Sequence, residues 1–224
     1  MANVTAQQVK SLRDRTSAGM NDCRQALLEA DGNEDAAVEI IQRKGLAKAA
    51  KKAGAIAAEG TIHSYIHSGR IGVLAEVNCQ TDFVARAEEF RSFVDEVGLQ
   101  IASSAPLFVR REEVPQAEQD KQLVIFRGQL EEEEAKTGKK RPEAAIAKIL
   151  EGKLDKWFSE VCLDEQELVT REDKATVKAV AEALTAKLGE KISVRRFVRF
   201  ELGEGIEKKV ADLAADVAEQ LRGA

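Results

Sequence analysis

The sequence predicts an α+β protein in which a small antiparallel sheet packs against helices. Apolar residues recur at helical spacing over most of the chain, but they alternate with polar residues between 60 and 79 and again between 192 and 202. Charged residues make up 33% of the chain, and strong helix formers such as Ala, Glu, Lys and Leu are abundant. A chain of 224 residues can therefore bury a core and still carry long, solvated helices.

Residues 1–45 are predicted to form a module of three short helices. Thr5, followed by Gln8 three residues later, has the pattern of a capping box for the first helix. Asn33 is predicted to cap the third helix, which is expected to end at Gly45. So few residues form only a marginal core on their own.

An Ala-rich segment, residues 46–59, is predicted to be a helical linker. It contains a cluster of Lys48, Lys51 and Lys52. The cluster has two interpretations that the sequence leaves open: a solvated helix face, or a contact with an acidic partner or a nucleic acid.

The predicted core begins with residues 60–111 and resumes over 163–203. Alternation around a Ser-Gly turn predicts a hairpin, and a helix is expected to start near Phe83. Alternation near the end of the second part predicts a third strand. Its apolar residues are expected to share one face that only Arg196 interrupts: Ile192, Val194, Val198, Phe200 and Leu202.

Two further helical units complete the prediction. Residues 112–162 have sparse apolar positions on either side of a "KTGKKRP" turn, which favours an antiparallel helical hairpin inserted between the two parts of the core. Residues 204–224 have apolar residues at helical spacing and are predicted to form a C-terminal helix.

Several classes of function find no support in the sequence. The chain has no GxxxxGK[ST] loop, and its "GEG" at 203–205 lacks the rest of a dinucleotide fingerprint. His63 and His67 lie four residues apart on a predicted strand, and two histidines are too few ligands for a metal site. Nothing predicts a nucleophile with a base partner. We therefore expect no enzyme activity, no cofactor and no metal.

Charge and cysteine usage bound the environment. The net charge of −5 argues against a globally basic nucleic-acid binder, so no specific nucleic acid is expected as a partner. The three cysteines are odd in number and far apart, which favours a reducing compartment. No leader segment or membrane-spanning run is evident, so the expected localisation is cytoplasmic, without a membrane partner.

Four stretches of the sequence resemble the elongation factor Ts family, in the family's order. They are "LRDRTSAGMNDCRQAL" (12–27), "GLAKAAKKA" (45–53), "EVNCQTDFVAR" (76–86) and "FVRFELGEGIEKK" (197–209). The resemblance implies an N-terminal module like a ubiquitin-associated (UBA) domain, an α+β core, a coiled-coil hairpin and a C-terminal helix. It also implies a guanine-nucleotide exchange factor that binds elongation factor Tu, in its GDP-bound and nucleotide-free forms, and promotes GDP release during translation elongation.

The resemblance assigns the main GTPase contact to Thr81, Asp82, Phe83 and Val84. Thr81 would cap a helix, Val84 would anchor it, and Asp82 and Phe83 would insert near the nucleotide and magnesium site of the GTPase. From its spacing alone Phe83 could equally lie on the core face of its helix, four residues before Ala87 and seven before Phe90.

Secondary contacts are implied at other positions that match the family. Arg13, Met20 and Arg24 belong to the N-terminal module, although surface and bundle core remain alternatives for them. His67 lies on the sheet. Leu168 and Val169 fall where the family has a short contacting segment, although the local sequence differs there.

The chain departs from the family pattern in two ways. Ser17, Asn21 and Arg24 replace the usual residues of the first motif. Long members carry a core of two similar halves, whereas this sequence contains a single "TDFV" block. A single half would expose apolar surface, so the resemblance implies a homodimer and a 2:2 complex with the GTPase.

Competing hypotheses predict different behaviour. A pure adaptor built on the N-terminal module would bind its partner without needing Phe83. Nucleic-acid binding through the lysine cluster at 48–52 would weaken steeply with salt.

Overall fold

The computed structural model describes residues 4–16, 18–52, 54–138 and 140–206, and it has an α+β fold. Within these residues lie eight α-helices, two short 3-10 helices and a three-stranded antiparallel sheet. The α-helices are α1 (Ala6–Thr16), α2 (Met20–Glu29), α3 (Glu34–Lys52), α4 (Asp82–Ala85), α5 (Glu88–Ser104), α6 (Gln116–Thr137), α7 (Glu143–Val161) and α8 (Val177–Leu188). The other elements are β1 (Glu59–His67), β2 (Ile71–Cys79), β3 (Ser193–Glu201), η1 (Arg111–Glu113) and η2 (Leu163–Glu165). The C-terminal helix is predicted to start at residue 204, but residues 202–205 form a turn, so the predicted start is wrong. The remainder of that prediction, 207–224, lies outside the described residues.

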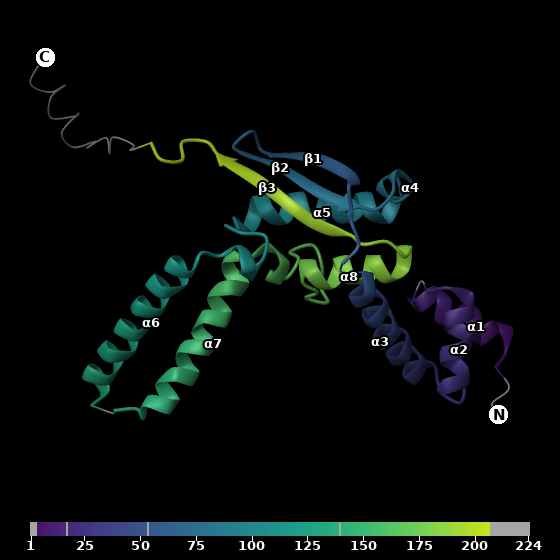
Figure 1. Cartoon of the computed structure of the whole chain (residues 1–224), viewed down its shortest axis with the longest axis horizontal. Coiled ribbons are helices and arrows are strands. Elements are labelled where there is room, and N and C mark those ends of the chain that lie inside the picture. Colours follow the sequence, from purple (N-terminus) through teal and green to yellow (C-terminus); the bar gives the residue numbers. More distant parts are fainter. Residues whose placement is uncertain (1–3, 17, 53, 139, 207–224) are drawn as a thin grey trace, which may run out of the picture.

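The sheet with α5 and α8 forms the centre of the molecule, and two helical units extend from it (Figure 1). Helices α1–α3 lie at one end, and α6 and α7 project from the other. α5 packs directly on one face of the sheet, and α8 lies on the same side. The largest buried cluster joins all three layers through residues such as Val77, Phe90, Phe93 and Val177.

Helices α1–α3 share a small apolar core of their own, which includes Leu12, Cys23 and Leu27. The predicted capping box is confirmed. The backbone nitrogen of Gln8 donates to Thr5 Oγ1 at 3.2 Å, and the backbone nitrogen of Thr5 donates to Gln8 Oε1 at 3.0 Å.

The predicted end of the third helix at Gly45 is wrong, because α3 continues without a break to Lys52. Gly45 serves close packing instead of termination. A Cβ atom built on it would lie 3.2 Å from Ala186 Cβ of α8, so the missing side chain lets the two helices approach each other. The helical propensity of the Ala-rich continuation then carries α3 past the glycine.

The sheet has the strand order β1-β2-β3, and the predicted hairpin of β1 and β2 is confirmed. β2 is the central strand, and its residues Val73, Ala75 and Val77 are buried against α5. β3 pairs with β2 from Ile71↔Glu201 to Asn78↔Ser193.

The prediction that the apolar residues of the third strand share one face is wrong. The pairing shifts register between Glu76 and Val77, which makes Arg195 an extra residue in β3. An extra residue of this kind reverses the alternation beyond it. Val194 therefore faces the core, whereas Val198 and Phe200 lie on the open face of the sheet.

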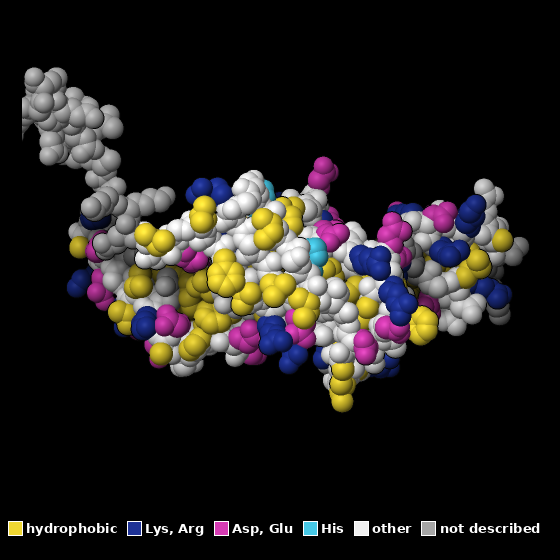
Figure 2. Space-filling model, turned by 90° about the horizontal axis from the view of Figure 1, so that it is seen from above, with side chains coloured by type: hydrophobic (Ala, Val, Ile, Leu, Met, Phe, Trp, Pro, Cys, Tyr) yellow, Lys and Arg dark blue, Asp and Glu magenta, His cyan; other side chains and the backbone are white. Residues whose placement is uncertain are grey.

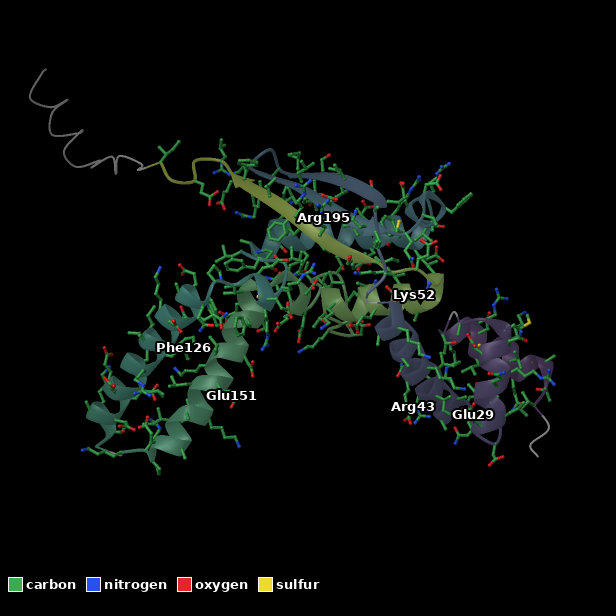
Figure 3. The ribbon with its side chains drawn as sticks, viewed as in Figure 1. Glu29, Arg43, Lys52, Phe126, Glu151 and Arg195 are labelled. Atoms are coloured by element: carbon green, nitrogen blue, oxygen red, sulfur yellow. The ribbon has the colours of Figure 1, made fainter. Side chains whose placement is uncertain are left out.

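The two helices predicted in residues 112–162 are observed as α6 and α7, which lie side by side (Figure 1). Polar contacts bridge them along their length, such as Arg127 to Glu143 at 3.2 Å. Lys153 Nζ of α7 also lies 5.5 Å from the ring centroid of Phe126 of α6 (Figure 3 labels Phe126). Each helix also buries a leucine in this unit, Leu130 in α6 and Leu150 in α7, so the pair combines polar contacts with apolar burial.

A partly buried carboxyl group lies where α7 returns to the core. Asp164 belongs to η2, and its backbone nitrogen donates to the Val109 carbonyl at 2.9 Å. Burial raises the pKa of Asp164 to about 6, and the charges of Arg110 and Lys178 offset only part of this effect. Glu113 and Glu112 raise the pKa further, so at neutral pH the folded protein carries an unfavourable charge here.

We expect Asp164→Asn to stabilise the protein at pH 7.5 by about 1–3 kcal/mol. The pKa of this carboxyl is higher in the folded than in the unfolded state, so wild-type stability falls as pH rises from about 4 to about 6. Urea unfolding at several pH values measures the difference, which should disappear below about pH 4. Asp14→Asn, at an exposed position, controls for the loss of one charge. An equal gain at pH 4 and pH 7.5 would contradict the interpretation.

Gly60 is required where the sheet begins. Its φ angle is +139°, and an added Cβ would lie 2.1 Å from the Val77 carbonyl oxygen of the neighbouring strand. Neither the backbone conformation nor the space admits a side chain.

We therefore expect Gly60→Ala to lower the free energy of unfolding by about 3 kcal/mol or more, measured by urea denaturation. The control is Gly152→Ala in α7, where an added Cβ would meet nothing within 4 Å. That change should stabilise the protein by about 0.5–1 kcal/mol through helix propensity. Equal effects of the two substitutions would show that Gly60 is not under this constraint.

Candidate functional site

The candidate site is the junction between β2 and α5, where four residues form the separate short helix α4. The single helix expected from Phe83 onward is instead two helices, because the chain leaves helical geometry at Ala87, the N-cap of α5. Thr81 caps α4 in an extended conformation (φ −131°, ψ 156°), and its Oγ1 accepts a hydrogen bond from the Val84 amide at 3.5 Å.

Phe83 and Val84 point in different directions from this short helix. Val84 is only 9% exposed and belongs to the main core, whereas Phe83 is 80% exposed. Consecutive helical residues are about 100° apart, so burying Val84 turns Phe83 toward solvent. The alternative in which Phe83 fills the core is therefore wrong, and Phe90 of α5 occupies that role. An exposed aromatic side chain on an anchored helix is suited to contact a partner.

Asp82 is the first residue of α4 and lies beside Phe83. It forms an ion pair with Arg86, four residues later, and about half of its side chain is exposed. A carboxylate at a helix N-terminus is favoured by the helix dipole. Asp82 therefore offers a negative charge next to an exposed aromatic ring.

Glu190, which the sequence analysis did not single out, holds the backbone before α4. It lies between α8 and β3, and its carboxylate accepts hydrogen bonds from the Thr81 amide at 2.9 Å, the Gln80 amide at 3.2 Å and Thr81 Oγ1 at 2.7 Å. The Lys191 amide in turn donates to Gln80 Oε1 at 3.1 Å. Residues so distant in sequence give no spacing signal that could have predicted this contact.

Cys79 lies beneath the same turn, and its thiol donates to the Thr81 carbonyl at 3.1 Å. Burial raises the pKa of this thiol, and the nearby charge of Glu190 raises it further. Cys79 therefore stays a neutral thiol at physiological pH and acts as a structural group here.

The N-terminal residues Arg13, Met20 and Arg24 are all exposed, on α1 and α2. Met20 and Arg24 are four residues apart and lie on the same side of α2. Leu28, four residues further, is also exposed and extends this stripe. Leu28 is not among the contact residues predicted from the sequence, although its spacing from Met20 and Arg24 places it on the same side of the helix.

His67 lies at the end of the sheet opposite to α4. Its Nδ1 is 3.0 Å from Tyr65 Oη, and it precedes the turn that leads into β2. At about 3.3 Å per residue, the length of β2 separates this end from Cys79 by roughly 26 Å. The structure thus does not bring His67 together with Phe83.

The last pair of predicted contact residues is divided between core and surface. Leu168 is 2% exposed and packs in the main core, whereas Val169 is 57% exposed. The Val169 amide donates to Gln100 Oε1 at 2.9 Å, which fixes this segment against α5. Only Val169 therefore offers an apolar surface to a partner in this arrangement.

The open face of the sheet, away from α5, carries a second apolar surface. Figure 2 shows hydrophobic side chains gathered over the middle of this face. We call it the open sheet face, and its exposed apolar residues are Ile62, Ile66, Leu74, Val198 and Phe200. Contiguous exposed patches of this kind mark interaction sites in proteins.

A charge cluster borders this face at the bulge in β3. Glu76 accepts hydrogen bonds from Arg195 at 2.8 Å and from Arg196 at 2.7 Å (Figure 3 labels Arg195). These contacts lower the pKa of Glu76 to about 2. The carboxylate is therefore charged over the whole physiological range.

The described residues offer neither a cluster of metal ligands nor a helix that could span a membrane. No group of three or more His, Cys, Asp and Glu side chains there is placed to hold a metal ion. Among the helices of the described chain, none combines the length and the apolar character that crossing a membrane requires.

Comparisons with known proteins identify the family. The family model described as "Elongation factor TS" matches residues 2–204. Elongation factor Ts of Desulforamulus reducens is 51% identical over 223 residues, which cover 99% of this chain and all of the relative. Elongation factor Ts of Myxococcus xanthus is 54% identical over 221 residues, with 99% of each chain covered. That of Carboxydothermus hydrogenoformans is 52% identical over 220 residues, with 98% of each chain covered. The chain belongs to the elongation factor Ts family.

Proposed function

We propose that this protein is a guanine-nucleotide exchange factor that binds elongation factor Tu and promotes GDP release during translation elongation. Asp82 and Phe83 insert near the nucleotide and magnesium site of the GTPase. The observation that carries this proposal is the exposed Phe83 ring, 80% accessible, on a helix whose next residue is anchored in the core. Membership in the elongation factor Ts family supplies the partner.

The proposed mechanism is differential binding rather than bond chemistry. Phe83 wedges between elements of the nucleotide-binding domain and disturbs the coordination of magnesium. Losing that coordination removes charge stabilisation from the bound phosphates. Asp82 contacts the partner beside the wedge.

Linkage requires that the exchange factor and GDP weaken each other's binding by the same factor. Each tenfold weakening corresponds to about 1.4 kcal/mol of coupling. Burying an aromatic side chain of this kind contributes about 2 kcal/mol or more at an interface hot spot. GTP, which favours the closed GTPase, then displaces the exchange factor from the empty site.

Secondary contacts extend the proposed interface. Arg13 and Arg24 favour acidic groups on the GTPase, and Met20 is an adaptable apolar contact between them. His67, at the far end of the sheet, contacts a distal domain of the GTPase. Val169 is the exposed member of the last contact segment, and Leu168 holds it from the core.

The proposed units follow the sequence prediction. Residues 1–45 are proposed to be a UBA-like partner-binding module, and 46–59 to link it to the core of 60–111 and 163–203, with α3 running through the boundary between module and linker. Residues 112–162 are proposed to be a coiled-coil hairpin. The protein works in the cytoplasm, where translation elongation takes place.

We expect Phe83→Ala to slow the stimulated release of a fluorescent GDP analogue from elongation factor Tu by about 30-fold, the equivalent of roughly 2 kcal/mol. Stopped-flow fluorescence with excess exchange factor measures this rate. Folding should be unchanged by circular dichroism, because the ring is exposed.

Val124→Ala is the matched control, since it also truncates an exposed apolar side chain but lies on α6. It should leave the rate unchanged. Full stimulation by Phe83→Ala would refute the wedge and keep exchange. Tight binding by both proteins without any stimulated release would favour the adaptor hypothesis.

The proposal includes a homodimer that forms through the open sheet face and binds two GTPases. A single sheet covered by helices on only one side leaves its other face apolar and exposed. Two such faces can pack on each other as in a β-sandwich. A two-fold axis makes the same patch serve both copies.

We expect Phe200→Glu to convert the protein from a dimer, of twice 24.5 kDa, to a monomer of 24.5 kDa in light scattering. Phe200 is 71% exposed on the proposed contact face, where a buried, unpaired carboxylate is unfavourable. Leu107→Glu, an exposed position outside the sheet, should remain dimeric. A wild-type mass of 24.5 kDa would exclude the dimer.

A further inference from the structure

We propose that Glu190 is a positioning residue for exchange, because its carboxylate holds the turn from which Phe83 projects. The inference rests on the proposed function, since it gives Glu190 a role through Phe83. It adds a second segment of the chain, the loop between α8 and β3, to the parts that determine exchange.

The pairing of β2 with β3 brings the two segments together. Asn78 near the end of β2 pairs with Ser193 at the start of β3, so the residues after β2 lie beside those before β3. α8 ends at Gly189, which has a left-handed conformation with φ +76° and turns the chain toward Glu190. Glu190 thus reaches the turn at Gln80 and Thr81 from a fixed position.

The contacts form a reciprocal clamp between the two segments. One carboxylate oxygen of Glu190 accepts from the amides of Thr81 and Gln80, at 2.9 and 3.2 Å, and the other accepts from Thr81 Oγ1 at 2.7 Å. In the opposite direction the Lys191 amide donates to the Gln80 side chain at 3.1 Å. Hydrogen bonds to an ionised carboxylate are stronger than bonds between neutral groups.

Thr81 joins this clamp to α4. The same Oγ1 that donates to Glu190 accepts from the Val84 amide, so the carboxylate also orients the helix cap. α4 has only four residues, and a helix that short is not stable by itself. Its direction therefore depends on the cap at one end and on the buried Val84 side chain.

A positioned helix matters because a wedge must resist displacement when it enters the partner. Val84 and the partly buried Ala85 hold α4 against the core, but apolar contacts are not directional. The directional bonds to Glu190 restrain the backbone immediately before Phe83. A misplacement of about 1 Å in a preorganised site can reduce a rate by up to about 100-fold.

The experiment compares Glu190→Ala and Glu190→Gln in the full chain. We expect Glu190→Ala to slow stimulated GDP release by about tenfold, because α4 loses its restraint. Glu190→Gln retains a carbonyl oxygen for the two amides and should recover most of the rate. In a Phe83→Ala background, Glu190→Ala should cause little further loss, since both act through one element.

Amide hydrogen exchange, measured by NMR without any GTPase, tests the positioning directly. Glu190→Ala should raise the exchange rates of the amides of Gln80, Thr81 and Val84 by about tenfold, whereas Glu190→Gln should change them little. Glu182→Ala is the matched control, because it removes a half-buried glutamate of α8, the helix before Glu190, and no hydrogen bond among the described residues joins Glu182 to the turn at Gln80 and Thr81.

The outcomes separate this inference from the proposed function. Unchanged amide exchange in Glu190→Ala would overturn the inference, whatever happens to GDP release. Loss of stimulation in Phe83→Ala with full stimulation in Glu190→Ala would also overturn it, while leaving the proposed function intact. Additive losses in the double variant would show that Glu190 acts other than through Phe83. If Phe83→Ala keeps full stimulation, the wedge fails, and the amide rates alone support or overturn the positioning of α4.

Discussion

The antiparallel pairing of β2 with β3 is the constraint on which the rest of the structure depends. It joins segments more than 100 residues apart, as in the contact of Glu76 with Arg195 at a separation of 119. The chain between β2 and β3, which includes α6 and α7, must therefore return to the edge of β2 on which β3 pairs. The pairing completes the sheet that α5 covers, and it also brings the loop after α8 against the turn that carries α4.

The two faces of the sheet have different environments: one is buried against α5 and the other is exposed. The inner face of β2 packs against α5, and this burial supplies most of the core. The opposite face carries exposed apolar side chains, and no described element covers it. The bulge in β3 makes this possible, because it sends Val194 inward and Phe200 outward from one strand. The bulge thus adds Val198 and Phe200 to the apolar surface of the open sheet face.

Carboxylates lie beside both surfaces for which a partner contact is proposed. Glu76 binds two arginines at the edge of the open face, and Glu190 binds two backbone amides and a hydroxyl before α4. In both places local donors satisfy the carboxylate oxygens. Asp164 is the contrast: burial raises its pKa to about 6, so its charge is a cost to stability at neutral pH.

The sequence by itself determined the elements whose signals are local. The capping box at Thr5 and Gln8, the hairpin of β1 and β2, and the two long helices α6 and α7 follow from spacing and turn residues within short windows. Resemblance of the "TDFV" stretch to a family identified the candidate site. Tertiary structure decided the rest. Gly45 continues a helix because α8 packs against it, and Phe83 faces solvent because Val84 takes the core. The face of Phe200 and the partner of Thr81 depend on how two distant strands pair, and no local pattern encodes that register.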